Sequence, residues 1–152
     1  LWAPNITLGI NFLILASQVL KEIAPYTDIQ IIEEHFRDKP EVSGTAKRAA
    51  EVLGLASDDI KSIRAGGIIG VHEIIFGLPF QTVRLRHESI SREAFGNGAI
   101  FGAVELQKRS EPGLYQMEQM MEPYFKGETN GSEEPAKRGW REGLISLMRR
   151  TK

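Results

Sequence analysis

Between residues 60 and 90 the spacing of apolar residues changes from helical to alternating, which requires a fold that contains a sheet as well as helices. Three segments have this pattern, IKSIRAG, GVHEIIFG and FQTVRLRHESI, and glycines or a Gly-Leu-Pro turn separate them. An earlier segment, DIQIIEEH at 28–35, also alternates and is rich in isoleucine. It predicts a further strand that leads into a loop at His35.

Helical patterns occur before, between and after these strands. We expect a helix over about 8–24 with Thr7 as its N-cap, a helix over 45–55, and a helix over 91–109 with Ser91 as its N-cap. Three glycines inside the last helix indicate close packing. The segment 111–125 is expected to be a turn plus a short segment. The order predicts an α+β domain with an open mixed sheet of about four strands and helices on one face.

The last predicted strand has a polar face, which is typical of a hydrated subunit interface. Its polar and apolar positions alternate, with Thr82, Arg84, Arg86 and Glu88 on one side and Val83, Leu85 and His87 on the other. We therefore expect the uncovered face of the sheet to meet a partner.

The composition excludes several classes of function. A formal net charge of −1 favours neither nucleic acid nor an anionic membrane, and the absence of cysteine excludes disulfides and thiolate metal sites and fits a cytoplasmic protein. The most apolar run, 8–20, is too short for the roughly 20 residues that span a bilayer. In this chain of 152 residues we expect a domain over 1–125, followed by a polar linker and short helical tail over 126–152. Since the chain begins at Leu1, without Met, we also expect a natural N-terminal part before it.

The stretch 33–46 contains the strongest candidates for chemistry. His35 can exchange a proton at neutral pH, Lys39 supplies a cation, and Ser43-Gly44-Thr45 opens a helix whose first N–H groups favour an anion. The alternative is a surface histidine followed by an ordinary N-cap. For the remaining histidines, His72 and His87, we expect packing or interface roles. The histidine spacing predicts no metal site, and no G-x-G-x-x-G fingerprint for a dinucleotide is present.

Six segments in order resemble motifs of the 4-hydroxy-tetrahydrodipicolinate reductase (dihydrodipicolinate reductase) family, in its C-terminal domain. They are APNITLGIN, DIQIIEEH, SGTA, IRAGGIIGVHEIIF, HESISREAFGNGA and GLYQM. The resemblance implies that His35 is the acid–base histidine, that Lys39 donates a proton, and that Gly44 and Thr45 hold a substrate carboxylate. Candidates for supporting roles in the matched stretches are Asn5, Phe36 and Arg92.

The chain departs from the family pattern H-H-x-x-K-x-D-x-P-S-G-T at several positions. Phe36 stands where the family has its second histidine, a residue that helps to bind the substrate in the family. The proline that precedes Ser43 in the family pattern is missing. Glu41 is the nearest counterpart of the aspartate in this pattern. The spacer between Lys39 and Ser43 is one residue shorter than usual, which shifts the lysine relative to the anion-binding turn.

The resemblance implies a nicotinamide-dependent reductase of diaminopimelate and lysine synthesis that acts on a cyclic dicarboxylate as a homotetramer. NADPH or NADH would be bound by an N-terminal Rossmann domain outside this chain, so we expect the chain alone to be inactive. Two alternatives remain open. One is a divergent reductase for another cyclic imine or amino acid, and the other is a non-catalytic oligomerisation module.

Overall fold

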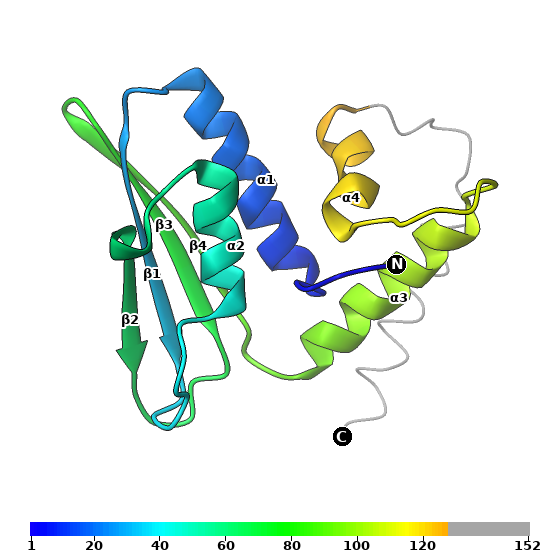
Figure 1. Ribbon diagram of the computed structural model, residues 1–152, viewed down its shortest axis with the longest axis horizontal. Coiled ribbons are helices and arrows are strands. Elements are labelled where there is room, and N and C mark those ends of the chain that lie inside the picture. The colour runs from blue at the N-terminus through cyan, green and yellow to red at the C-terminus, as the bar shows by residue number, and fades with distance from the viewer. Residues whose placement is uncertain (128–152) are drawn as a thin grey trace. The chain divides into compact units, whose positions relative to one another are not determined.

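The isoleucine-rich segment forms a central strand, β1 (Asp28–His35), of a four-stranded sheet in the order β2-β1-β3-β4. The other strands are β2 (Ile60–Arg64), β3 (Val71–Leu78) and β4 (Gln81–Glu88). Strand β1 is parallel to β2 and antiparallel to β3, which is antiparallel to β4. The computed structural model describes residues 1–127 (Figure 1). The prediction of an open mixed sheet in an α+β fold is confirmed.

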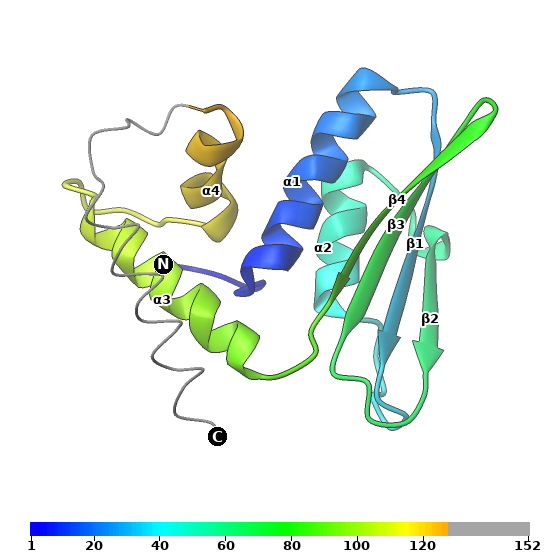
Figure 2. The ribbon, with the colours of Figure 1, turned by 180° about the vertical axis from the view of Figure 1, so that it is seen from behind.

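Helices α1 (Leu8–Ile23) and α2 (Gly44–Leu53) lie on the same face of this sheet (Figures 1 and 2). A short 3-10 helix, Ser57–Asp59, precedes β2, and α3 (Glu93–Gln107) and α4 (Met117–Phe125) follow β4. The expected helix bounds are right to within two residues. For 111–125 the expected turn plus short segment is instead a loop and helix α4.

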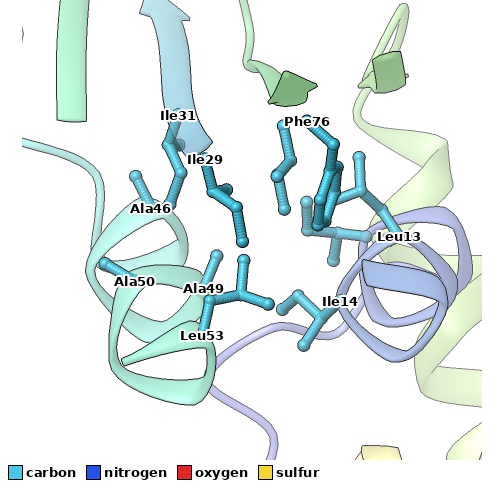
Figure 3. Close-up of a cluster of buried hydrophobic side chains, with 11 residues drawn as sticks. Leu13, Ile14, Ile29, Ile31, Ala46, Ala49, Ala50, Leu53 and Phe76 are labelled. Carbon is cyan, nitrogen blue, oxygen red and sulfur yellow. The ribbon is translucent and has the colours of Figure 1, made fainter. Parts of the chain in front are cut away.

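The core lies between the sheet and these two helices (Figure 3). Ile31 and Phe76 from the sheet are fully buried and meet Ile14 of α1 and Leu53 of α2. Burying each such side chain contributes about 1.5–3 kcal/mol. Alanines line the sheet-facing side of α2, namely Ala46, Ala49 and Ala50, and their small size lets the helix approach β1 closely.

The structure confirms Thr7 at the N-cap position of α1 and corrects the cap predicted at Ser91. Thr7 occupies the N-cap position of α1, but its hydroxyl makes no capping hydrogen bond. Instead, Nδ2 of Asn11 donates to the carbonyl oxygens of Asn5 (2.7 Å) and Thr7 (2.8 Å) and holds the start of the helix. The N-cap of α3 is Arg92, and Ser91 hydrogen-bonds the Glu93 carboxylate, lowering its pKa.

Segment 1–7 packs against α3 and the chain before α4. The backbone N–H of Trp2 donates to the carbonyl of Tyr115 (2.8 Å). A Cβ at Gly98 would lie 1.7 Å from the carbonyl oxygen of Ile6, so only glycine allows this backbone approach. Close packing is thus confirmed at Gly98, whereas a Cβ at Gly96 would meet nothing within 4 Å.

The face of the sheet opposite α1 and α2 is largely charged. Arg84 pairs with Glu73 on the neighbouring strand β3 (2.5 Å), and Arg86 reaches across β3 to pair with Glu34 on β1 (3.1 Å). The polar alternation predicted for β4 is confirmed. Within residues 1–127, no helix has the length and apolar character needed to cross a membrane. The predicted helical tail over 140–150 lies outside the described residues.

Candidate active site

The core-facing side of the sheet becomes polar at one end. Ile31 pairs with isoleucines on both β2 and β3. Two residues later, Glu33 is opposite Ser62 on β2 and His72 on β3. His72 is in turn opposite His87 on β4. Residues two apart on a strand point to the same face, so this row extends the face that forms the core. The parallel strands β1 and β2 have their carboxyl ends here, where ligands bind in sheets of this kind.

A cavity of about 110 Å³ opens at this end of the sheet. Its lining includes His35, the N-terminal turn of α2 at Thr45, and the segment that precedes α1. The polar residues around it are Asn5, Thr7, His35, Thr45, His72, His87 and Ser89, and the apolar ones include Ile10, Ile69 and Phe95. Segments that are far apart in the sequence therefore line the same cavity.

Glu33 is fully buried beneath this cavity and remains ionised. Its carboxylate accepts hydrogen bonds from the Ser62 hydroxyl (2.6 Å), from Nη2 of Arg64 (2.6 Å) and from Nδ1 of His35 (2.5 Å). Burial raises the pKa of Glu33, but the hydrogen bonds from Arg64, Ser62 and His35 outweigh burial and lower it to about 2. A permanent negative charge thus lies next to the histidine ring.

The His35 ring lies between this carboxylate and the cavity. It meets the ring of His72 edge to face, with 5.3 Å between the centroids. It also lies against Gly70, where a Cβ would be only 3.2 Å from Nε2. The glycine therefore leaves room beside the nitrogen atom that Glu33 does not contact.

His72 is neutral, and it ties β3 to the start of α2. Its Nε2 is 2.9 Å from the Ser43 hydroxyl, which accepts the N–H of Thr45 as the N-cap of α2. Burial lowers the pKa of His72 to about 3, with smaller contributions from the charges of His35, His87 and Lys39. Burial also lowers the pKa of His87. The contact with Ser43 agrees with the packing role expected for His72, and both histidines also line the cavity.

The Ser43-Gly44-Thr45 turn begins α2 beside the cavity, and Thr45 is part of the lining. Thr45 Oγ1 donates to Oδ1 of Asn5 at 2.5 Å, which links the turn to the segment before α1. Nδ2 of Asn5 is buried without a hydrogen-bond partner in the described part of the chain. Around Gly44 a Cβ would meet nothing within 4 Å, so the open backbone of this residue is available to a ligand.

Lys39, Phe36 and Arg92 do not line the cavity. Lys39 is near enough for its charge to lower the pKa of His72, and its ammonium forms no ion pair within residues 1–127. Its carbonyl accepts a hydrogen bond from Nε of Arg64 (3.0 Å), which fixes the loop. Phe36 is 44% exposed, and Arg92 is exposed at the start of α3.

Three residues of this site, Glu33, Ser62 and Arg64, were not predicted from the sequence. One signal was present in the alternation of β1. Glu33 occupies the same parity as Ile29, Ile31 and His35, and a carboxylate on the buried side of a strand requires partners. Ser62 and Arg64 have the matching parity on β2, but only the register of the two strands identifies them as those partners.

The described residues offer no place for a metal or for the phosphates of a dinucleotide. No group of three or more His, Asp or Glu among residues 1–127 is arranged to hold a metal ion. The loop from β1 to α2, residues 36–43, contains no glycine, and α2 begins at Gly44. This β-α-β unit therefore lacks the Gly-rich turn that holds the phosphates of a dinucleotide.

Comparisons with known proteins agree with this arrangement. The family model "Dihydrodipicolinate reductase, C-terminus" matches residues 6–121. The 4-hydroxy-tetrahydrodipicolinate reductases of Methanococcoides burtonii and Rickettsia bellii are 32% and 34% identical over 78% and 77% of this chain. The matches cover 52% and 54% of those proteins, so the chain spans about half the length of these curated relatives.

A solved structure is similar as well. The dipicolinate-bound dihydrodipicolinate reductase from Paenisporosarcina sp. TG-14 superposes with a TM-score of 0.68 at 27% identity. The superposition covers 77% of this chain and 52% of that one. The fold, the ordered motifs and the family match lead to one conclusion: the chain belongs to the family of dihydrodipicolinate reductase C-terminal domains.

Proposed function

We propose that this chain is the substrate-binding and acid–base half of a 4-hydroxy-tetrahydrodipicolinate reductase of diaminopimelate and lysine synthesis in the cytoplasm. The observation that supports it best is the meeting of His35 and the N-terminal turn of α2 in one cavity. A proton-exchanging group and an anion-binding helix terminus are what a cyclic dicarboxylate with a reducible imine requires.

Gly44 and Thr45 are proposed to bind one carboxylate of the substrate. The backbone at the start of α2 and the helix dipole favour a negative charge, by about 0.3–1 kcal/mol for the dipole at an exposed site. Lys39 is proposed to face the same ligand, because its ammonium is unpaired within residues 1–127 and its field reaches His72. Unpartnered Nδ2 of Asn5 is an additional donor at the cavity wall.

His35 and Lys39 are proposed to manage the proton of the reduction. Reduction of a conjugated imine adds a hydride and a proton, and a nicotinamide supplies the hydride when it is bound. The Glu33 carboxylate accepts the hydrogen bond of Nδ1 of His35 and so orients the ring toward the cavity. NADPH or NADH is proposed to be held by another domain of the full protein, because the β-α-β unit described above does not fit it.

A second candidate, a reductase for a different cyclic imine or amino acid, is favoured by one observation. Phe36 occupies the position of a substrate-binding histidine of the family, and it is partly exposed beside the loop. Losing one charge-assisted hydrogen bond to a carboxylate removes about 1.5–3 kcal/mol. A ligand with one carboxylate instead of two would not need this hydrogen bond.

Titration of this chain with dipicolinate tests the proposal. Isothermal calorimetry should show saturable binding of dipicolinate, with amide shifts at Gly44 and Thr45 in heteronuclear NMR spectra. Picolinate, which has one carboxylate, is the matched ligand. Tighter binding of picolinate would support the second candidate, and binding of neither ligand would leave the non-catalytic oligomerisation module.

A further inference from the structure

The two carboxylate oxygens of Glu33 serve different partners. Oε1 accepts the Ser62 hydroxyl and Nη2 of Arg64, each at 2.6 Å, and the backbone N–H of Ser43 at 3.4 Å. Oε2 faces Nδ1 of His35 at 2.5 Å. Both donors from β2 therefore bond to Oε1 of Glu33, and His35 bonds to Oε2.

This division determines which nitrogen of His35 holds the proton in the neutral ring. An ionised carboxylate only accepts hydrogen bonds, so Nδ1 must be the donor in its contact with Glu33. Nε2 is then the unprotonated nitrogen. Within residues 1–127 no hydrogen bond to Nε2 is formed, and its neighbour Gly70 lines the cavity.

We propose that Glu33 is a positioning residue, which keeps the proton of neutral His35 on Nδ1 and leaves Nε2 as the proton acceptor at the cavity. That His35 exchanges a proton with substrate rests on the proposed function, whereas the tautomer follows from the contacts alone. Two donors from β2 fix the carboxylate, and the carbonyl of His35 accepts the N–H of Ala65 (3.0 Å). Both ends of the pair are thus anchored to β2 and to the residue that follows it.

The same carboxylate also reaches the anion-binding turn. Its Oε1 is 3.4 Å from the backbone N–H of Ser43, the N-cap of α2. Glu33 thereby sets the position of the histidine relative to the helix terminus where a carboxylate would bind. A residue that acts in this way contributes to the reaction through its neighbours and does not contact the substrate itself.

The substitution Glu33→Gln tests the assignment with little change in shape. Ser62 and Arg64 still donate toward the position of Oε1, so the single carbonyl oxygen of glutamine should turn toward them. Its NH₂ group then faces Nδ1 of His35, which must become the acceptor. We expect ¹⁵N NMR of the neutral ring to show a change from the Nδ1–H to the Nε2–H tautomer.

Glu34→Gln is the matched control, because Glu34 is the next residue on β1 and points to the opposite face, toward Arg86. It should leave the tautomer unchanged. Two results would overturn the inference: a proton on Nε2 of neutral His35 in the wild-type chain, or a proton that stays on Nδ1 in folded Glu33→Gln. The wild-type result does not depend on the folding of the variant. The tautomer is measured without ligand, so failure of the wild-type chain to bind dipicolinate overturns the proposed function separately.

Discussion

Ser43 and His72 are 29 residues apart in the sequence, yet the hydroxyl of one lies 2.9 Å from Nε2 of the other. The contact joins the N-cap of α2 to the start of β3, two elements that the chain connects only through β2. This contact therefore helps to hold the Ser43-Gly44-Thr45 turn against the sheet, together with the hydrogen bond from the Ser43 N–H to Glu33.

Ser43→Ala should destabilise the domain by about 1–3 kcal/mol. It removes an N-cap, which costs about 0.5–2 kcal/mol, and leaves the buried Nε2 of His72 without its partner. Urea unfolding followed by circular dichroism measures the change. Ser57→Ala is the control, because Ser57 is exposed, and a change within about 0.5 kcal/mol is expected there. Equal effects of the two substitutions would contradict the assigned role of Ser43.

The free energy of unfolding should fall as the pH decreases from 6.5 to 5. Folded His72 has a pKa of about 3, lowered from its ordinary 6.5 mainly by burial, so the unfolded chain binds more protons in this range. The expected slope from this residue is up to about 1.4 kcal/mol per pH unit. Protonation of Glu33, which has a pKa of about 2 in the folded chain, lowers the free energy of unfolding further only below about pH 4.5.

His72→Gln should reduce this slope, as measured by urea unfolding at several pH values. Burial also lowers the pKa of His87, so a smaller dependence should persist in the variant. The charged and titratable groups that act on His72 are His35, His87, Glu33 and Lys39. An unchanged slope in the variant would show that His72 is not the group that titrates.

Gly98→Ala should destabilise the protein by about 1–3 kcal/mol or more, because the new Cβ would lie 1.7 Å from the carbonyl oxygen of Ile6. Gly96 lies two residues earlier in the same helix and has open space where a Cβ would be. Gly96→Ala should therefore be neutral or stabilise by about 0.5–1 kcal/mol, from helix propensity. Thermal unfolding of the pair measures the difference, and a stabilising Gly98→Ala would disprove the close approach.

Lys39→Gln should weaken dipicolinate binding by roughly 10-fold or more, which corresponds to losing a charge-assisted hydrogen bond of about 1.5–3 kcal/mol. Lys47→Gln makes the same change of charge on the exposed side of α2, two residues from Thr45. It should change the affinity less than threefold, because a solvated charge is screened. Calorimetry on both variants checks this, and equal losses would mean that Lys39 acts only through the net charge.

The chain should sediment as a tetramer of 17.0 kDa subunits, because the charged face opposite the helices is proposed as the assembly surface. Ile63 on β2 is 45% exposed, and its parity places it on that face. Ile63→Glu should dissociate the assembly in sedimentation velocity. Val19→Glu, on α1 with 46% exposure, is the control and should not. A stable wild-type monomer at micromolar concentration would contradict the proposal.

The helices and strands were predictable because their periodicities are local properties of the sequence. The alternation of isoleucines in β1 and the alanine face of α2 placed both elements within two residues of their bounds. The Ser91 cap was wrong because α3 begins at Glu93 with Arg92 at the N-cap position, and residue propensity does not fix a helix start to a single residue.

The site was predictable only in part, for a geometric reason. His35 and the Ser43-Gly44-Thr45 turn are close in the sequence, so their proximity follows from one loop. The contacts of Glu33 with Ser62 and Arg64, and of Thr45 with Asn5, span 29 to 40 residues and depend on strand order and register. A shift of register by one residue would turn Ser62 and Arg64 to the opposite face, and no local pattern specifies that register.

The β1–α2 unit places the two halves of the site on elements that respond differently to insertions and deletions. Glu33 and His35 are fixed in register on β1, whereas residues 36–42 form a connecting loop that tolerates a change of length. Such a change moves the anion-binding turn and leaves the carboxylate–imidazole pair in place. On the proposed function, substrate preference can therefore diverge over evolutionary time through the loop while the proton-transfer chemistry is inherited unchanged, and we propose that the shortened loop with Phe36 is a variation of this kind.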